Sequence, residues 1–378
     1  MKRTVELSAV VVHFRAAELA ARAVARLRAE LETFPGGAEI LVVDNGSEAA
    51  ERRLLERLPV RLLDPGANLG YAGGANHGIA AARGRLLLVM NPDVLVLPGC
   101  CRALVEALET DAAAAGPRFF WDEGRRLLLP PPEARTRRDA LLRALSPRSP
   151  RLERSARHRW RRHARRQWLA RAPYPTLDLA GALLAIRRDA WERAGPFDEG
   201  YRLYFEETDW LRRLPRLGLE ARFVPGAEAV HLYDRSGCVE PLSRKWFGAS
   251  EERFRRRHYG RAFAALLSGL GRLPPAGPGA GRGGSASAPA LTRPRLDIAV
   301  PAGIPAPLWV ELSPSPLGFP AAAEQVDLEA GRLRWELPEE IWQRLEPGGY
   351  RVALVDAEGG ERAWFRVARA RGTSTVPW

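Results

Sequence analysis

The chain has 378 residues, of which 27% are charged, and its formal net charge is +13. This length allows one large domain and a smaller one, and the sequence holds no apolar run long enough to cross a bilayer. The three cysteines fit neither a disulfide framework nor the spacing of a metal site, and no signal-peptide core precedes the first strand. We therefore expect a protein of the reducing cytoplasm rather than a secreted scaffold.

The first hundred residues alternate between strand and helix patterns. Strands are predicted at residues 7–14, 39–44, 60–63 and 86–90, the last within an apolar stretch that runs to residue 97, and helices at 16–31, 48–58 and 98–109. Such alternation with short connections is typical of a mostly parallel sheet with right-handed crossovers. We expect an α/β, Rossmann-like fold with helices on both faces of the sheet.

Acidic and amide side chains stand where these strands end. Asp44 closes the second strand and is followed by Asn45, and Asn91-Pro92-Asp93 interrupts the fourth. In open α/β sheets ligands bind at the carboxyl ends of the strands. Two acids with an amide beside one of them suit a divalent cation or a sugar hydroxyl. The alternative is that Asp93 only caps a turn.

A glycine-rich stretch, residues 68–78, precedes the fourth strand and opens a helix that runs to residue 83. The backbone N–H groups of such a turn, at a helix N-terminus, favour a phosphate. Its glycines do not match G-x-G-x-x-G, and no Lys-Ser/Thr follows. The pattern therefore disfavours a dinucleotide dehydrogenase and a phosphate-loop ATPase.

The second half of the same domain contains an acidic cluster. Further strands are predicted at residues 112–121, 125–129, 179–186 and 221–225, with helices at 189–194 and 245–270. Glu206, Glu207 and Asp209 lie within four residues and are framed by aromatic side chains. Crowding and partial desolvation raise the pKa of such acids, which suits a general base; the alternative is an acidic first turn that complements a helix dipole. His231, after the last of these strands, reads either as a ligand or as a structural histidine.

In their order and spacing these motifs resemble the inverting family-2 glycosyltransferases of the GT-A fold, in the rhamnosyltransferase-like branch. The resemblance covers about residues 5–260 and rests on residues 10–14, 42–47, 68–76, 91–93, 195–198, 205–209 and 225–231.

The resemblance implies a nucleotide-sugar donor and a divalent metal. Asn91-Pro-Asp93 stands in the place of the family's Asp-x-Asp, so Asp93 and His231 would contact Mg²⁺ or Mn²⁺. Asn91 departs from the acidic first position, so we expect a weaker metal site or one completed by the donor. Asp44 would hold the base or the ribose. The residues expected to bind the nucleotide-sugar are Asp44, Asn45, Asn68, Gly70, Gly73, Asn76, Asn91, Asp93 and Gly181.

The resemblance also implies the reaction. Glu207 would act as the base, with Asp209 and Glu206 as alternates, in a single displacement at the anomeric carbon. We expect transfer of rhamnose from dTDP-rhamnose to a hydroxyl of a surface polysaccharide or of a lipid-linked acceptor. The alternatives are a UDP-sugar donor, a sugar-nucleotide nucleotidyltransferase and an Arg-rich nucleic-acid-binding protein. The nucleotidyltransferase would need a glycine-rich loop with a basic residue after the first strand, which residues 13–18 lack.

The positive charge is concentrated between residues 134 and 172, a stretch that contains fourteen arginines and only two acidic residues. This insert could be a solvated basic helix. It could also bind an anionic membrane or a polyprenyl-diphosphate acceptor, because Trp160 and Trp168 interleave with the arginines. The membrane interpretation would place the enzyme peripherally at the inner face of the plasma membrane. Nucleic acid, which such segments also suit, is not an expected partner.

We expect three parts along the chain. Residues 1–271 would form the GT-A glycosyltransferase domain with the insert at 134–172, and residues 272–295, rich in Gly, Pro and Ser, would form a linker. Residues 296–378 would form a small all-β, sandwich-like domain, with strands at 296–300, 308–312, 332–336, 350–355 and 362–367. Its tryptophans either stack on sugar rings or form the core.

Overall fold

The computed structural model describes residues 5–32, 34–232, 240–274, 295–300, 303–329 and 331–369. The chain forms two compact units: unit 1 comprises Met1–Phe119 and Gln167–Leu266, and unit 2 comprises Phe120–Arg166 and Leu267–Trp378. Most of the Arg-rich insert therefore belongs with the C-terminal part of the chain, whereas the sequence analysis placed it in the first domain. Most of the predicted linker, residues 275–294, lies outside the described residues.

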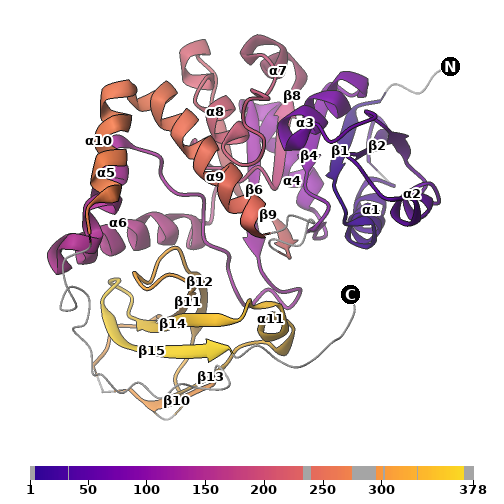
Figure 1. Ribbon diagram of the computed structural model, residues 1–378. Helices are drawn as coiled ribbons and strands as arrows, with labels where there is room; N and C mark the ends of the chain where they lie inside the picture. Colours follow the sequence, from indigo (N-terminus) through magenta and orange to yellow (C-terminus); the bar gives the residue numbers. More distant parts are fainter. Residues whose placement is uncertain are drawn as a thin grey trace. The chain divides into compact units, whose positions relative to one another are not determined.

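Unit 1 is built on one large sheet (Figure 1). Its strands are β1 (Leu7–His13), β2 (Ala38–Asp44), β3 (Arg61–Leu63), β4 (Leu86–Met90), β5 (Val94–Val96), β6 (Ala114–Phe120), β7 (Tyr174–Pro175), β8 (Leu183–Arg187) and β9 (Ala221–His231). Among the described residues the sheet has nine strands in the order β3-β2-β1-β4-β8-β6-β9-β5, with β7 paired to β9.

The strands β3, β2, β1 and β4 are mutually parallel, as predicted. Beyond β4 the pairing changes, since β8 runs antiparallel to β4 and to β6, and β9 runs antiparallel to β5 and β7. The predicted α/β fold is confirmed, with an antiparallel extension at one side. Residues 125–129, expected as a strand, form only isolated bridges at Leu128.

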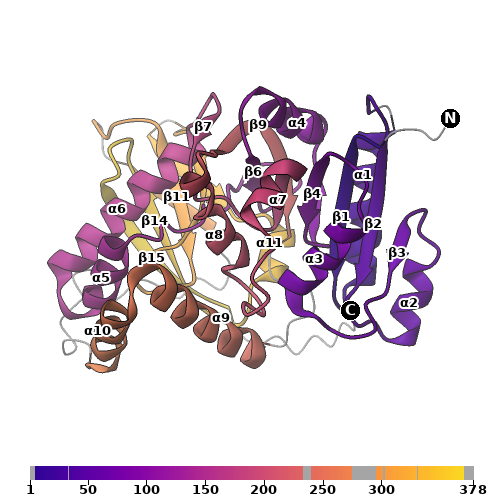
Figure 2. The ribbon, with the colours of Figure 1, turned by 90° about the horizontal axis from the view of Figure 1, so that it is seen from above.

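The helices are α1 (Ala17–Leu31), α2 (Ala49–Leu55), α3 (Gly70–Ala81), α4 (Cys100–Thr110), α7 (Arg188–Ala194), α8 (Glu206–Leu211) and α9 (Glu240–Phe254), with a 3₁₀ turn η2 (Leu214–Leu217). They cover both faces of the sheet (Figure 2). Alternate strand residues enter two separate cores: Ala9 and Val11 pack with α1 and α4, whereas Val10 and Val12 pack with α3, α7 and α8. Successive side chains point to opposite faces of the sheet, and both faces are buried. For this reason β1 and β4 are continuous apolar runs in the sequence.

The single amphipathic helix predicted at 245–270 is interrupted. α9 passes into a π-helical turn, η3 (Arg255–Tyr259), and Gly260, at φ +90°, separates it from α10 (Arg261–Arg272). Only a residue that tolerates positive φ allows this change of direction without strain. In the described part of the chain, no helix is both long enough and apolar enough to cross a membrane.

Unit 2 contains two antiparallel sheets, β10-β13 and β12-β11-β14-β15. Its elements are α5 (Arg137–Leu145), η1 (Ser146–Arg148), α6 (Pro150–Trp168, whose last two residues fall in unit 1), β10 (Arg295–Ala299), β11 (Leu308–Ser313), β12 (Ala322–Val326), β13 (Arg332–Glu336), α11 (Glu339–Arg344), β14 (Gly348–Val355) and β15 (Glu361–Arg369). The expected C-terminal β structure is confirmed, but β12 and α11 were not predicted. Trp309 and Trp335 are 2% and 3% exposed, so these two belong to the interior rather than to a sugar-binding surface.

The Arg-rich helix α6 covers one face of the larger sheet in unit 2. Leu308, Val310 and Leu312 of β11 enter the apolar core on the other face, so Glu311 points toward α6. Arg161 Nη2 lies 2.8 Å from Glu311 and 2.9 Å from a carboxylate oxygen of Glu361. Part of the arginine content is therefore structural, because a buried carboxylate requires a buried cation.

Candidate active site

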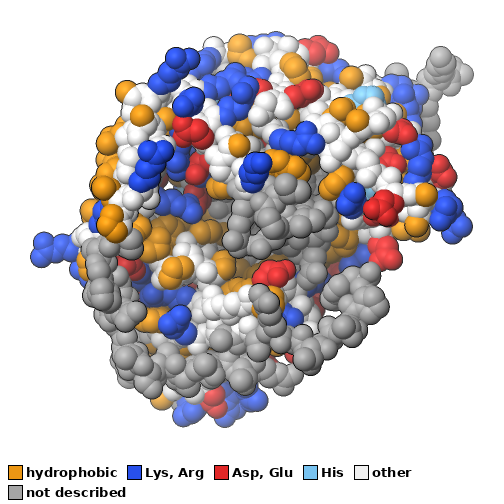
Figure 3. Space-filling view, viewed as in Figure 1, with side chains coloured by type: hydrophobic (Ala, Val, Ile, Leu, Met, Phe, Trp, Pro, Cys, Tyr) orange, Lys and Arg blue, Asp and Glu red, His pale blue; other side chains and the backbone are white. Residues whose placement is uncertain are grey.

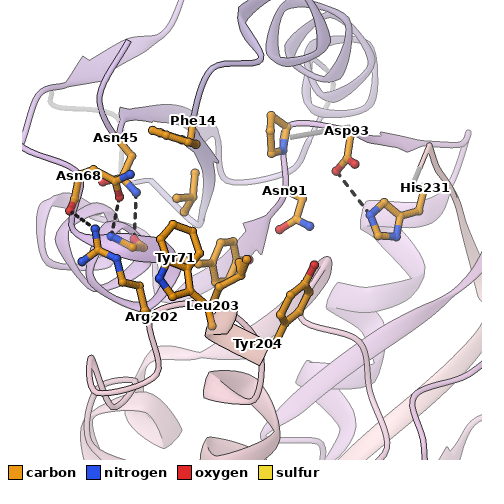
Figure 4. A pocket seen from close by; sticks show the side chains of 14 residues that line it. Phe14, Asn45, Asn68, Tyr71, Asn91, Asp93, Arg202, Leu203, Tyr204 and His231 are labelled. Carbon is orange, nitrogen blue, oxygen red and sulfur yellow. Dashed lines mark hydrogen bonds and ion pairs between the residues drawn. The ribbon is translucent and has the colours of Figure 1, made fainter. Parts of the chain in front are cut away.

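The strand register brings the predicted strand-end residues to one edge of the sheet. His13 at the end of β1 is paired with Asp44 at the end of β2, and Val11 is paired with Met90 at the end of β4. A pocket of about 180 Å³ opens at this edge (Figure 4). Its lining includes six predicted site residues, namely Asn45, Asn68, Gly70, Asn91, Asp93 and His231.

Asp93 and His231 face each other because the short strand β5 pairs with the end of β9. Val94, the first residue of β5, lies opposite His231 at the end of β9, and the Leu232 N–H donates to the Asp93 carbonyl at 3.0 Å. His231 Nε2 lies 3.4 Å from Asp93 Oδ1, and Asp93 is only 1% exposed. A carboxylate oxygen and an imidazole nitrogen at this separation can bind the same divalent cation.

The metal centre is nevertheless incomplete as a protein site. Within the described residues, no group of three or more His, Cys, Asp and Glu side chains could hold a metal ion. Asn91 supplies no charge, so Asp93 is the only carboxylate of this tripeptide. A cation held by Asp93 and His231 would therefore need further ligands beyond these two side chains.

The amides that open α3 are already occupied by protein acceptors. The Leu69 N–H donates to Asn45 Oδ1 at 2.8 Å, the Gly70 N–H to Asn68 Oδ1 at 2.8 Å, and the Tyr71 N–H to the Arg202 carbonyl at 3.2 Å. The prediction that this turn offers its backbone N–H groups to a phosphate is wrong for these three groups. Asn45 and Asn68 shape the turn.

The glycines of α3 serve mainly close packing. A Cβ added at Gly78 would lie 2.3 Å from Val10 Cγ1, and one added at Gly74 would lie 2.8 Å from Val12 Cγ1. Gly70 is different, because it has a φ of +73° and because a Cβ added there would lie 2.7 Å from the Arg202 carbonyl oxygen. Both features require glycine at this position beside the pocket. The run of glycines thus lets α3 approach β1 closely.

Four predicted donor-site residues are absent from the lining of this pocket in the described part of the chain: Asp44, Gly73, Asn76 and Gly181. Asp44 is buried and accepts a hydrogen bond from the Ser47 N–H at 2.9 Å. The Asn76 amide donates to the Phe197 carbonyl at 3.0 Å and accepts from the Phe197 N–H at 3.0 Å, which fixes the 195–200 loop. The structure gives Asn76 a positioning role.

The three acids of the predicted base cluster have three different environments. Burial, and then the charge of Glu207, raise the pKa of Glu206 well above its usual value. Burial would also raise the pKa of Asp209, but hydrogen bonds from His258 at 2.7 Å and Arg213 at 2.6 Å outweigh it and lower that pKa. Glu207 is half-buried and packs against Gly181, where an added Cβ would lie 3.0 Å from its Cγ.

Tyr71 links this acidic cluster to the pocket. It lines the pocket, and its hydroxyl donates to the Gly181 carbonyl at 2.8 Å. Burial first, then the charges of Glu206, Glu207 and Asp93, raise its pKa well above the usual value. The phenol therefore stays protonated, and it interacts electrostatically with all three carboxylates.

Three further lining residues come from segments that the sequence analysis did not assign to the donor site. Arg202 places its guanidinium carbon 5.4 Å from the ring centroid of Trp246 on α9. Tyr204 is 39% exposed and extends its hydroxyl toward Asn91 (Figure 4). Tyr204 and Phe205 have φ of +66° and +74°, which is strained backbone for residues other than glycine. The only sequence feature that pointed to these lining residues was the group of aromatic residues that flank the acidic cluster.

The pocket at the carboxyl ends of the strands and the acidic cluster beside it are what the predicted glycosyltransferase would need, and the comparisons with known proteins agree with that class. The model of Glycosyl transferase family 2 matches residues 8–193. The chain belongs to this family and is a glycosyltransferase. This membership favours the predicted class over a nucleotidyltransferase or a nucleic-acid-binding protein.

Among its relatives is an N-acetylglucosaminyl-diphospho-decaprenol L-rhamnosyltransferase of Mycobacterium tuberculosis, 32% identical over 226 residues, which cover 54% of this chain and 69% of that protein. A low-salt glycan biosynthesis hexosyltransferase, Agl10, of Haloferax volcanii is 25% identical and covers 60% of this chain and 67% of its own length. The solved structure of the mannosyltransferase PcManGT from Pyrobaculum calidifontis, in complex with GDP-Man and Mn²⁺, is 15% identical with a TM-score of 0.42. It covers 70% of this chain and 79% of its own. That structural likeness is too distant to support an argument about function.

Proposed function

We propose that the enzyme transfers rhamnose from dTDP-rhamnose to a hydroxyl of a lipid-linked or polysaccharide acceptor. The observation that supports this most is the 32% identity to a rhamnosyltransferase over 69% of that protein's length. The pocket at the carboxyl ends of β1, β2 and β4 is where an open α/β sheet binds a nucleotide.

In this proposal Glu207 is the general base. Asp209 is committed to Arg213 and His258, and burial raises the pKa of Glu206, which disfavours its ionised form relative to an ordinary glutamate. Glu207 is the remaining acid of the cluster, and it is half-buried rather than buried. Glu207 takes the proton of the acceptor hydroxyl while its oxygen bonds to the anomeric carbon. The bond from that carbon to the diphosphate breaks, and the nucleoside diphosphate leaves with the electron pair, so the anomeric configuration inverts.

The leaving diphosphate needs positive charge on the other side of the reacting carbon. Asp93 and His231 are the residues that would hold Mg²⁺ or Mn²⁺, with the donor's oxygens completing the coordination. Such an ion would stabilise the charge that develops on the diphosphate. Arg202, at the pocket, supplies a guanidinium suited to the same oxygens.

A lipid-linked acceptor would lie in a bilayer, so the enzyme would work at a membrane surface, at the inner face of the plasma membrane. The relative from Mycobacterium tuberculosis is named for a decaprenol-diphosphate acceptor. An acceptor of this kind is therefore the one we propose first, and a free polysaccharide end is the alternative.

A panel of nucleotide-sugars tests the donor. The midpoint of thermal unfolding is measured with dTDP-rhamnose, UDP-glucose, UDP-N-acetylglucosamine and GDP-mannose, each with and without Mn²⁺. We expect the largest stabilisation with dTDP-rhamnose, because a ligand stabilises only the state that binds it, and a smaller effect for Asp93→Asn. Greater stabilisation by a UDP-sugar would mean that the donor is that UDP-sugar and not dTDP-rhamnose. No stabilisation by any of the four would contradict the proposal.

A further inference from the structure

Helix α6 has two chemically different faces. Arg157, Arg161 and Arg165 lie on the face that packs against the sheet of unit 2, and each is less than 10% exposed. Arg157 donates to both Glu361 carboxylate oxygens, at 3.2 and 3.1 Å, and Arg165 donates to backbone carbonyls of residues 356 and 357. These arginines make hydrogen bonds within unit 2 and are not available to a partner.

The opposite face of α6 is exposed and basic. It carries Arg151, Arg154, His158 and Arg162, all of them exposed, and their spacing of three or four residues aligns them along the helix. We call these four residues the basic stripe. Among the described residues, the side chains of the three arginines of the stripe make no ion pair or hydrogen bond.

The acids of the same stretch do not neutralise the stripe, because each is taken by another arginine. Glu133 lies 3.1 Å from Arg135, and Asp139 lies 2.8 Å from Arg159. Glu153 is paired with Arg157 on the buried side. The positive charge of the stripe is therefore uncompensated and faces solvent.

Apolar side chains lie at the edge of the stripe. Arg159 and His163 flank it and hold the preceding segment: Arg159 pairs with Asp139 on α5, and His163 Nε2 lies 2.8 Å from the Pro132 carbonyl oxygen. α5 carries Leu141, Leu142 and Leu145, yet none of its residues is buried. The three leucines are half-buried, so part of their apolar surface faces solvent and is available to an apolar partner.

The end of α10 extends this apolar surface. Arg148 in η1 donates to the carbonyls of Leu270 and Leu273, the latter at 2.6 Å, which ties the end of α10 to η1 directly after α5. The Leu273 side chain is 51% exposed, and Figure 3 shows apolar side chains gathered along the edge over α10. Leu273 thus adds exposed apolar surface beside η1, next to α5.

We propose that unit 2 docks on an anionic lipid bilayer, with the basic stripe against the headgroups and the leucines of α5 in the interface. Arginines attract anionic lipids, and leucines gain free energy only where an apolar phase receives them. A soluble polyanion such as RNA would use the stripe but not the leucines. The proposal does not depend on which sugar is transferred, since it concerns binding without donor or acceptor.

The test is co-sedimentation of the full chain with vesicles, with no substrate present. Vesicles of phosphatidylglycerol and phosphatidylcholine in roughly equal parts are compared with pure phosphatidylcholine, at about 0.1 M and about 0.5 M salt. We expect binding to the anionic vesicles at low salt, weakened at high salt, and little binding to the neutral ones. Equal binding to both vesicles, or to neither, would overturn the proposal.

Variants locate the surface. Arg151→Glu/Arg154→Glu/Arg162→Glu should lower partitioning by about 100-fold or more, since each arginine near an anionic surface contributes about a factor of five. The matched control is Arg53→Glu/Arg57→Glu/Arg102→Glu, three exposed arginines of unit 1, which changes the net charge equally and should bind like the unaltered chain. An equal loss in the control would show that only net charge acts, and would overturn the assignment.

A second variant separates a bilayer from nucleic acid. Leu141→Ser/Leu142→Ser keeps every charge and should weaken vesicle binding by roughly tenfold or more. Its binding to single-stranded RNA, measured in the same buffer, should equal that of the unaltered chain. Unchanged vesicle binding in this variant, or RNA binding tighter than vesicle binding in the unaltered chain, would contradict the proposal.

Discussion

At the scale of single residues, the site separates three neighbouring acids by their surroundings. Glu206 is 4% exposed and its Oε2 finds no hydrogen-bond partner among the described residues, whereas Asp209 is fully enclosed by cations and donors. Their pKa values therefore move in opposite directions. Such divergence between adjacent acids is how an enzyme assigns different roles to the same side-chain type.

Glu206→Gln tests this separation through stability. Because the folded pKa of Glu206 lies above the usual value near 4.5, the folded state keeps a proton that the unfolded chain loses as the pH rises past that value. The unaltered chain therefore loses stability above about pH 4.5, and the glutamine variant does not. We expect the advantage of Glu206→Gln in thermal unfolding midpoint to grow as the pH rises above about 4.5.

Asp209→Asn provides the contrast. The lowered pKa of Asp209 contributes stability that is present above its usual value of 3.8 and is lost as the pH falls. The asparagine variant should therefore be less stable at neutral pH and approach the unaltered chain in acid. Parallel pH profiles for both variants would refute the assigned pKa directions.

At the scale of elements, the Arg-rich helix shows what a sequence can and cannot reveal. The helix and its charge are plain in the sequence, but Glu311 and Glu361, which pair with Arg161, stand 150 and 200 residues further on. No local pattern links such distant partners. The interpretations of the insert as wholly solvated or wholly ligand-binding both missed that one face of α6 is internal.

Arg161→Met tests the internal face of α6. Removing this guanidinium leaves Glu311 buried without its main partner, which costs about 3–5 kcal/mol in the free energy of unfolding. Arg162→Met, on the exposed neighbour, should change it by about 0.5 kcal/mol or less. The double variant Arg161→Met/Glu311→Leu should regain most of the loss, because it removes both buried charges. Equal midpoints of thermal unfolding for Arg161→Met and Arg162→Met would show that the pair stabilises nothing.

The glycine-rich segment illustrates the limit of motif reasoning at the same scale. Its position between β3 and β4 and its helical end were predictable from the sequence. Its use was not, because the atoms that occupy the first N–H groups of α3 come from Asn45 and Arg202. The sequence shows the turn, whereas the hydrogen-bond partners depend on the packed structure.

At the scale of the whole molecule, the parallel strands and the pocket at their ends were predictable because buried strands and their terminal acids leave a local signature. The antiparallel strands β8, β6 and β9 had weaker signatures, and the grouping of residues 120–166 with the C-terminal sheets had none. The contributions of Tyr71, Arg202 and Trp246 to the pocket depend on long-range packing. The assignment of Asp93 and His231 required both the sequence and the structure. The motif suggested the two residues, and the pairing of β5 with β9 brings them together.

We propose that this chain transfers rhamnose with inversion, with Glu207 as the base. The most direct measurement is transfer from dTDP-rhamnose to an N-acetylglucosaminyl-diphospho-polyprenol, followed by determination of the anomeric configuration of the product. We predict an inverted linkage with the unaltered chain, and a rate lower by about 10²–10⁴-fold with Glu207→Gln, while dTDP-rhamnose still raises the unfolding midpoint of that variant. A retained configuration, or full turnover by Glu207→Gln, would contradict the account.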